Sequence, residues 1–363
     1  MPSYEEFLRR LPKAELHCHF VGAIPAHTAW EIARRNSIRL PADSAETLYD
    51  FADFYTFLQV YMAVAAALRT REDFAEAVYA TLREGHERGN LRYREMFFNP
   101  TDHYRSGATY PGIVDGLIDG IRAAEQDFGV RCRLIPSINR MESPAVASAM
   151  LDDVLSHRRD EVIGIGLDAA ERSGPPEHFA EVFQRAARAG LRRTAHTCED
   201  NQTLTEGPPR NAVTCLDRLG CDRLDHGYNL LADETVTARV RDEQVPFTVC
   251  AHTSNKHLVD RRRHTIAAML DAGLNISLHT DDPAMFGTDP GETYVAACTD
   301  LGLDADAAVR LALAAVDAAW LDDGDRRTLR ASFQQQADDL REQLSAGPGR
   351  PGAPGPQDMP AAR

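Results

Sequence analysis

Several side chains of the types that bind metal ions or transfer protons lie where strand-like, apolar stretches of this sequence end: His17, His19, His196, Glu199, His226, Asp281 and Asp282. His17 and His19 are two residues apart, and residues at that spacing in a strand point to the same face. Two neighbouring imidazoles at a strand end are a natural pair of metal ligands. A single histidine or aspartate in such a place is usually a packed core residue or a helix cap, but the whole set together indicates an active site.

The chemistry that fits this set is hydrolysis assisted by a metal ion. Three histidines and one aspartate can bind one zinc ion and leave a coordination position for water: His17, His19, His196 and Asp281. Zinc lowers the pKa of a bound water from about 15.7 towards 7, which provides hydroxide at neutral pH. We therefore expect one Zn²⁺ per chain.

The remaining side chains could move protons or hold a substrate. Glu199 lies three residues after His196, past the strand end, and could protonate a ring nitrogen while hydroxide attacks the adjacent carbon. His226 could orient the hydroxide or stabilise the developing charge. On a continuing strand Asp282 would point away from Asp281, which leaves it able to accept a hydrogen bond from the substrate.

These residues need a scaffold that brings several strand ends together. Short apolar or β-branched runs alternate with longer helical patterns, which predicts repeated βα units and a parallel sheet. The predicted strands are residues 14–20, 91–98, 131–138, 162–168, 191–197, 223–226, 246–251 and 275–280. Eight strands alternating with helices predict an α/β fold, the (β/α)8 TIM barrel, in which active sites lie at the C-terminal ends of the strands.

The connection after the first predicted strand is long, roughly residues 21–90, and contains helical patterns at 24–36, 54–68 and 71–88. We expect this helical insertion to emerge at the C-terminal rim of the barrel, where it could form a lid over the pocket. Residues 1–345 are expected to form a single catalytic barrel domain. The tail, 346–363, is rich in glycine and proline and is predicted to be disordered.

Composition narrows the class of partner. The chain has 363 residues and a formal net charge of −15, which disfavours nucleic-acid binding. The basic run at 261–264 is the main exception, and we interpret it as the solvated start of a helix.

No stretch of about 18 apolar residues predicts a membrane span, and the first residues lack the apolar region of a signal peptide. Seven scattered cysteines without a C-x-x-C pair favour a reducing, cytoplasmic setting.

Ordered motifs resemble the adenosine and adenine deaminases of the metallo-dependent hydrolase superfamily. They include LPKAELHCH at residues 11–19, LDHG at 224–227 and TDDPAMFG at 280–287. The resemblance implies one zinc ion, held by three histidines and an aspartate, and hydrolysis of the 6-amino group of an adenine-type purine with release of ammonia. It also implies that Glu199 acts on purine N1, that His226 assists the attacking water, that Asp282 hydrogen-bonds N7 and that the backbone N–H of Ala169 faces N3.

Departures from the family pattern bear on the substrate. The segments FFNP at 97–100 and GIGLDAAE at 164–171 look closer to the adenine deaminase branch. Val21 stands where nucleoside deaminases usually have an acidic residue that contacts the ribose 5′-hydroxyl, and valine cannot accept that hydrogen bond. Adenine, adenosine and a 5′-modified adenosine therefore all stay open as the small-molecule partner. We expect Cys198 to be a passive wall of the pocket and His279 to shape its base, while the role of His252 stays open.

Two alternatives compete with this interpretation. One is another mononuclear metal-dependent hydrolase of C–N bonds. Barrel hydrolases that bridge two metals often use a lysine from the fourth strand, but the predicted strand 162–168 contains none, which favours a single metal. The other is a zinc-containing purine-binding protein without catalysis, and Glu199 and His226 argue against it because metal binding alone requires neither. Homo-oligomerisation also stays open.

Overall fold

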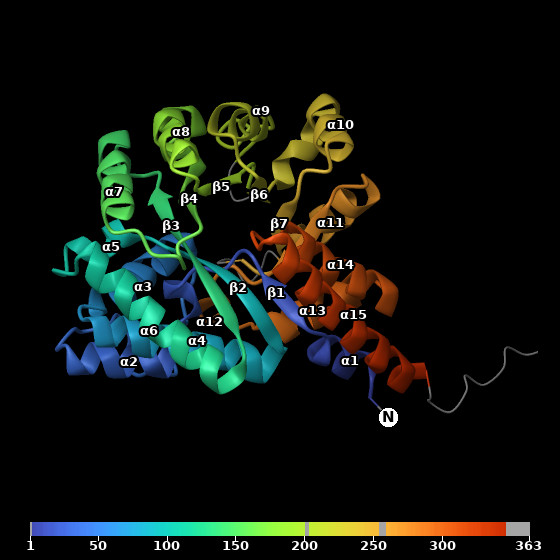
Figure 1. The fold of residues 1–363 in the computed structure, drawn as a ribbon, viewed down its shortest axis with the longest axis horizontal. Coiled ribbons are helices and arrows are strands. Elements are labelled where there is room, and N and C mark those ends of the chain that lie inside the picture. Colours follow the sequence, from blue (N-terminus) through green and yellow to red (C-terminus); the bar gives the residue numbers. More distant parts are fainter. Residues whose placement is uncertain (1, 200–202, 254–258, 346–363) are drawn as a thin grey trace, which may run out of the picture.

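Eight parallel strands follow one another around a barrel in the order in which they occur in the sequence (Figure 1). The computed structural model describes residues 2–199, 203–253 and 259–345. The strands are β1 (Lys13–Glu15), β2 (Leu91–Phe98), β3 (Arg131–Asn139), β4 (Gly164–Asp168), β5 (Arg192–Thr197), β6 (Arg223–His226), β7 (Phe247–Cys250) and β8 (Ile276–His279). The predicted (β/α)8 barrel is confirmed, and each predicted strand overlaps an observed one.

The first strand is shorter than the predicted span of 14–20. β1 ends at Glu15, and pairing resumes only at two isolated bridges, Cys18 with Asp281 and His19 with Phe97. The backbone N–H of His19 donates to the carbonyl oxygen of Asp281 at 2.8 Å. The backbone N–H of Asp281 donates to the carbonyl oxygen of His17 at 3.1 Å. These bonds join the ends of the first and last strands, so the barrel closes at the residues that were expected to bind metal.

The helices surround the barrel (Figure 1). They are α1 (Tyr4–Arg10), α2 (Ala26–Arg35), α3 (Phe54–Ala67), α4 (Arg71–Gly89), α5 (Pro100–Tyr104), α6 (Tyr110–Phe128), α7 (Pro144–Ser156), α8 (Ala180–Arg188), α9 (Arg210–Thr214), α10 (Glu234–Asp242), α11 (Val259–Asp271), α12 (Pro283–Phe286), α13 (Pro290–Asp300), α14 (Ala305–Ala318) and α15 (Asp323–Ser345). Short helical turns are η1 (Val21–Ala23), η2 (Glu171–Ser173), η3 (Pro176–Phe179), η4 (Cys215–Leu219) and η5 (Tyr228–Ala232). The predicted tail, 346–363, lies outside the described residues.

The insertion after the first strand is helical, as predicted, and contains η1, α2, α3 and α4. Capping boxes start the last two of these helices. The Asp53 side chain accepts the backbone N–H of Thr56 at the start of α3, and Thr70 accepts that of Asp73 at the start of α4. Such boxes satisfy N–H groups that have no partner inside the helix. The sequence therefore fixes where these helices begin, and α3 reaches the C-terminal rim of the barrel, where it lines the cavity described below.

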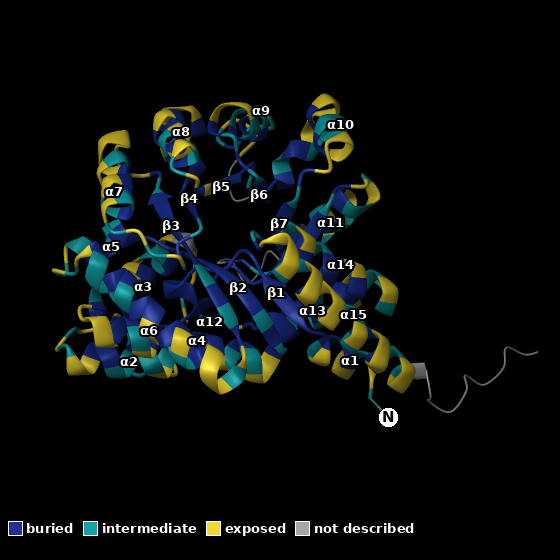
Figure 2. Cartoon of the chain, in the orientation of Figure 1, coloured by how far each residue is buried: buried dark blue, intermediate teal, exposed yellow. Residues whose placement is uncertain are grey.

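The core lies between the strands and the inward faces of the helices, and exposed positions are confined mostly to the outward helix faces (Figure 2). Close helix packing supports this arrangement at α4 and α6. A Cβ atom at Gly120 of α6 would overlap the carbonyl oxygen of Ala75 and the side chain of Val78 in α4. Glycine therefore permits the two helices to approach more closely than any larger residue would.

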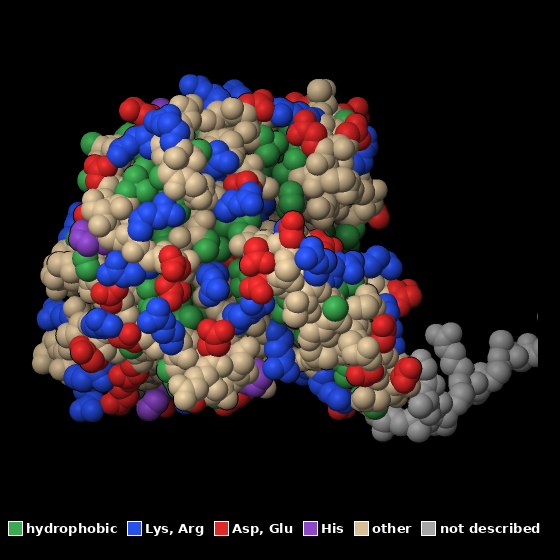
Figure 3. Space-filling view, in the orientation of Figure 1, with side chains coloured by type: hydrophobic (Ala, Val, Ile, Leu, Met, Phe, Trp, Pro, Cys, Tyr) green, Lys and Arg blue, Asp and Glu red, His purple; other side chains and the backbone are tan. Residues whose placement is uncertain are grey.

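Acidic and basic side chains are interspersed on the face of the molecule drawn in Figure 3. Ion pairs join neighbouring elements at the surface of the protein, such as Arg71 with Asp119 at 2.5 Å and Arg239 with Asp217 at 2.6 Å. Within the part of the chain that the structure describes, none of the helices combines the length and the apolarity that crossing a bilayer demands.

Candidate metal and catalytic site

A cavity of about 280 Å³ opens at the C-terminal ends of the strands. Most of the predicted site residues line it: His19, Ala169, His196, Glu199, His226, Asp281 and Asp282. His17 is fully buried, and its ring packs against the rings of His196 and His226 with centroids 4.5 and 4.6 Å apart. Val21 is buried in the core and is not among the described residues that line the cavity. The structure thus brings together every predicted site residue except Val21.

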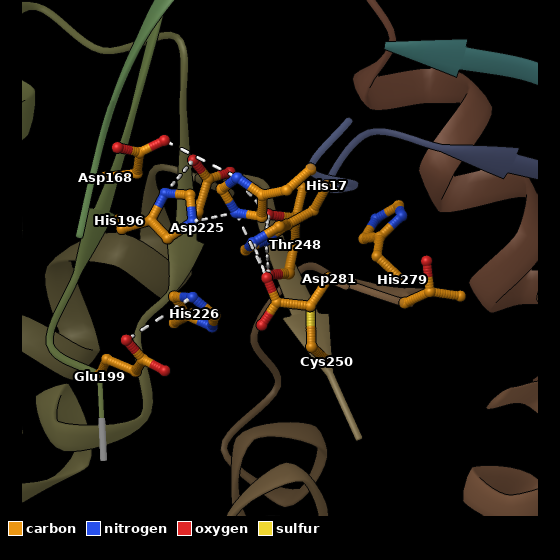
Figure 4. A network of polar contacts seen from close by, with 12 residues as sticks. His17, Asp168, His196, Glu199, Asp225, His226, Thr248, Cys250, His279 and Asp281 are labelled. Atoms are coloured by element: carbon orange, nitrogen blue, oxygen red, sulfur yellow. Dashed lines mark hydrogen bonds and ion pairs between the residues drawn. The ribbon is translucent and has the colours of Figure 1, made fainter. Parts of the chain in front are cut away.

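The candidate metal ligands converge on one point (Figure 4). His17, His196, His226 and Asp281 each offer a ligand atom, and these atoms lie within 4.8 Å of one another. His19 joins this group, since its Nε2 is 3.3 Å from Oδ1 of Asp281 and 3.0 Å from Nε2 of His196. The predicted four ligands are therefore adjacent, and His226, predicted as a catalytic residue, lies within reach of the same point.

Hydrogen bonds around His17 provide a test of whether a cation fits here. Thr248 donates its hydroxyl proton to Oδ1 of Asp225 at 2.7 Å, and its Oγ1 and carbonyl oxygen lie 3.0 and 3.3 Å from Nδ1 of His17. Nδ1 must then carry a proton, and in the neutral ring that a metal ligand requires, Nε2 has a lone pair. This Nε2 is buried without a hydrogen-bond partner and faces Oδ1 of Asp281 at 3.3 Å. Two facing lone pairs repel each other unless a cation lies between them, so the residues present fit a metal ion.

The charge balance of the cavity points the same way. Burial by itself would lower the pKa of His19, but the carboxylates of Asp281, Asp282 and Asp168 raise it to about 10. The carboxylates around this ring therefore stabilise positive charge. A site of three or more histidines with an aspartate is a typical zinc donor set.

Asp225, for which the sequence predicted no role, supports two of the candidate ligands. Its Oδ2 lies 3.4 Å from Nδ1 of His196, and its Oδ1 accepts the hydroxyl of Thr248, which in turn holds His17. Burial would raise the pKa of Asp225, but the adjacent imidazoles of His196 and His17 lower it far below its usual value. Such carboxylate–histidine contacts orient metal ligands and fix their tautomers. Strand register could have signalled this role, because Asp225 pairs with His196 on one side and Thr248 on the other.

Asp282 is placed differently from the sequence expectation. A continuing strand would have pointed Asp281 and Asp282 to opposite faces, but Asp281 has a φ of 67°, and both carboxyl groups line the cavity. A Cβ atom at Gly22 would overlap the Asp282 side chain, so only glycine leaves room for it. Burial and the neighbouring Asp281 raise the pKa of Asp282 well above its usual range. The protonated side chain that this favours can donate a hydrogen bond.

His226 is held as a neutral ring. The Tyr228 hydroxyl accepts the N–H of Cys250 at 2.8 Å and donates to the Cys250 carbonyl at 3.1 Å, so it can only accept from Nδ1 of His226, at 3.3 Å. Burial and the nearby rings of His17 and His196 lower the pKa of His226 well below its usual value. Its Nε2 therefore presents a lone pair towards Oε2 of Glu199, 3.9 Å away.

Two buried charged residues for which the sequence predicted no role contact Glu199 or the turn that carries it. Glu171 accepts the backbone N–H groups of Cys198 and Glu199 at 3.1 and 3.4 Å, which shapes the turn after β5. Arg262 donates from Nη2 to Oε1 of Glu199 at 2.7 Å. Arg262 is 2 % exposed. The interpretation of the run at 261–264 as a solvated helix start is therefore wrong for this residue.

Two further expectations have clear outcomes. Cys198 does not form a wall of the cavity, because its side chain is fully buried with Sγ 3.3 Å from the carbonyl oxygen of Pro208. His279 accepts the backbone N–H of Leu16 at 3.1 Å and donates to the hydroxyl of Ser277 at 2.7 Å. It therefore holds the bend between β1 and His17 at the base of the site, and it is not part of the ligand cluster found among the described residues.

The chain is similar to known proteins in both sequence and fold. A model of the adenosine deaminase family matches residues 12–336. An adenine deaminase of Cupriavidus metallidurans is 36% identical over 94% of this chain and 94% of its own length, and one of Streptomyces coelicolor is 38% identical over 92% and 97%. Among solved structures, a zinc-bound amidohydrolase from Burkholderia ambifaria has a TM-score of 0.87 at 32% identity, covering 94% of each chain. An adenine deaminase from Arthrobacter aurescens has a TM-score of 0.81 at 33% identity, covering 92% and 99%. The chain belongs to the adenosine deaminase family, whose members are hydrolases acting on C–N bonds.

Proposed function

We propose that this protein is a zinc-dependent adenine deaminase that replaces the 6-amino group of the free base with oxygen from water and releases ammonia. The observation that carries the proposal is the cluster of buried histidines and a buried aspartate around one point, with Glu199 and Asp282 lining the same cavity. His17, His19, His196 and Asp281 would hold the ion, one per chain, and His226 lies within reach of it. When bound, zinc supplies Lewis acidity that makes water a nucleophile near neutral pH.

The protein's own residues then have separate tasks. Glu199, beside the cavity, would deliver a proton to purine N1 as C6 is attacked. The bare Nε2 of His226 would accept a proton from the attacking water. Asp282, whose pKa is raised by burial and by Asp281, would donate a hydrogen bond to N7. Ala169 has a φ of 67° and lines the same cavity, where its backbone N–H would face N3.

Several observations favour the free base over a nucleoside. Val21 lies in the core and offers no acceptor for a ribose hydroxyl. The cavity, at about 280 Å³, is at the small end of ligand sites. The C. metallidurans and S. coelicolor relatives also carry the name adenine deaminase.

The test is ammonia release by the zinc-loaded protein with adenine, adenosine, 5′-modified adenosines and N6-substituted adenines. We expect the highest kcat/KM with adenine. A higher kcat/KM with adenosine would refute the preference for the base, and silence on every compound with zinc bound at one per chain would refute the purine assignment. For the metal, His17→Ala should abolish zinc binding, while the exposed histidine of η3, His178→Ala, should not.

A further inference from the structure

A buried arginine from another βα unit contacts the proposed acid. Arg262 lies in the first turn of α11 and is 2 % exposed. Its Nη2 donates to Oε1 of Glu199 at 2.7 Å, within the range of strong charge-assisted hydrogen bonds. Arg262 also lines the cavity. A cationic side chain in such a place must have a structural or functional reason, because burying a charge is costly.

The arginine is itself held in place from the end of β7. Its Nη1 donates to the carbonyl oxygens of His252 and Cys250 at 2.8 and 3.4 Å. Its guanidinium carbon lies 5.0 Å from the centre of the Tyr228 ring, a cation–π distance. A planar guanidinium fixed at several points loses little further freedom when it binds a carboxylate. Arg262 is thus a rigid support and not a mobile surface side chain.

We infer that Arg262 is the positioning residue for Glu199, and that it holds Oε1 so that Oε2 is the oxygen presented to the substrate. This inference rests on the proposed function. A guanidinium N–H can only donate, so Oε1 must act as an acceptor. A proton on the acid form of Glu199 is then carried by Oε2, the oxygen that lies 3.9 Å from Nε2 of His226. Arg262 therefore selects which oxygen delivers the proton to the purine ring.

Arg262 also contacts the residue that orients His226, the proposed base. Tyr228, on which the guanidinium stacks, is the residue whose hydroxyl fixes the tautomer of His226. Both Arg262 and Tyr228 bind the backbone at Cys250. The end of β7 thus serves as one anchor for the proposed acid and for the proposed base.

The test compares Arg262→Met and Arg262→Lys with a control, Arg239→Met, using the zinc-loaded protein and adenine. Arg239 makes ion pairs with Asp217 and Glu243 on the outside of the barrel. Arg239→Met therefore also removes arginine–carboxylate ion pairs, but away from the cavity. Arg262→Met should lower kcat by about 10- to 100-fold, part of what an acid contributes, with KM changed little. Arg262→Lys should recover part of that loss because it keeps a donor, and Arg239→Met should leave both constants unchanged.

A double-mutant cycle with Glu199→Gln separates positioning from other roles. If Arg262 acts through Glu199, adding Arg262→Met to Glu199→Gln should cause no further loss of kcat. A further loss as large as that in the wild-type background would overturn the inference. Wild-type kcat in Arg262→Met, or loss of zinc or of cooperative melting in both Arg262 variants, would also overturn it. If the wild type did not deaminate adenine at all, the proposed function would fail and this inference with it.

Discussion

Asp225→Asn is the change that most directly tests how the metal site is supported. The amide has nearly the same shape as the carboxylate, so packing is preserved, but the negative charge and one acceptor oxygen are lost. Asp225 is fully buried and makes two supporting contacts, one to Nδ1 of His196 and one through the hydroxyl of Thr248 to Nδ1 of His17. The substitution therefore weakens the orientation and basicity of two candidate ligands without touching a ligand itself.

The expected magnitude follows from the number of ligands affected. Loss of an outer-shell partner typically costs about 10- to 100-fold in metal affinity. Because Asp225 supports both His17 and His196, we expect a loss near the upper end, about 100-fold or ~2.7 kcal/mol. Thr248→Val removes only the hydroxyl that links Asp225 to His17, leaves the contact of Asp225 with His196, and should cost about tenfold. Thr194→Val removes a hydroxyl that donates to Asp225 at 2.8 Å but contacts no ligand, so it serves as the control and should change affinity little.

The assay is competition for Zn²⁺ between the metal-free protein and a chromophoric chelator of known affinity, which requires no activity. Far-ultraviolet circular dichroism and thermal melting would show that each variant is folded. Zinc affinity of Asp225→Asn within twofold of the wild type would refute the supporting role. Thr248→Val affects only one of the two contacts through which Asp225 supports the candidate ligands. A larger loss of zinc affinity in Thr248→Val than in Asp225→Asn would therefore refute this account of the contacts.

Three other changes have outcomes that the structure specifies. Glu199→Gln should keep zinc but lower kcat by about 10²- to 10⁴-fold, and full activity would refute its role as the acid. Burial and the charge of Asp168 raise the pKa of Asp102 from 3.8 to about 7, so the folded protein holds this proton more tightly than the unfolded chain. The free energy of unfolding of the wild type should then fall as the pH rises from 3.8 to about 7. Asp102→Asn lacks this titration, so its Tm minus that of the wild type should increase from pH 5 to pH 8, and a Tm difference that stays constant over this range would contradict the prediction. Gly22→Ala should displace the Asp282 side chain and raise KM for adenine. An unchanged KM would count against a role of Asp282 in substrate binding.

The barrel and the clustering of most candidate site residues could be predicted from the sequence because the signals are local. Apolar runs that end in His196, His226 or Asp281 mark the C-terminal ends of strands, and a parallel barrel brings such ends to one rim whatever the loops do. The helices of the insertion were also predictable, because capping residues such as Asp53 and Thr70 mark where they begin. Each of these features depends on residues within a few positions of one another.

The supporting residues escaped prediction because their roles depend on neighbours far away in the chain. Arg262 stands in a run of basic residues, and local composition favours a solvated position. A periodic signal was present nevertheless, since Ile266 and Met269 follow it at helical spacing and are both buried. Extending that buried face back by one turn places Arg262 inside, but its carboxylate partner could not be known, because Glu199 comes from another βα unit. Val21 shows the converse, since its position in a motif indicated contact with substrate and packing placed it in the core.

The geometry at the rim could not be read from strand periodicity, because the backbone leaves the strand conformation where the chemistry is. Ala169, Cys198, His226 and Asp281 follow or end four different strands, and all have φ between 53° and 70°. The left-handed conformation costs a residue with a side chain about 1–2 kcal/mol. Four such costs at one rim are tolerated only if the surrounding contacts enforce them, and strain of this kind concentrates at functional sites. Each left-handed residue ends the alternation of side chains between the two faces of its strand. Adjacent residues such as Asp281 and Asp282 can therefore both reach the cavity. On ideal strand ends, adjacent residues such as Asp281 and Asp282 would point to opposite faces. The left-handed residues are therefore part of what assembles the site.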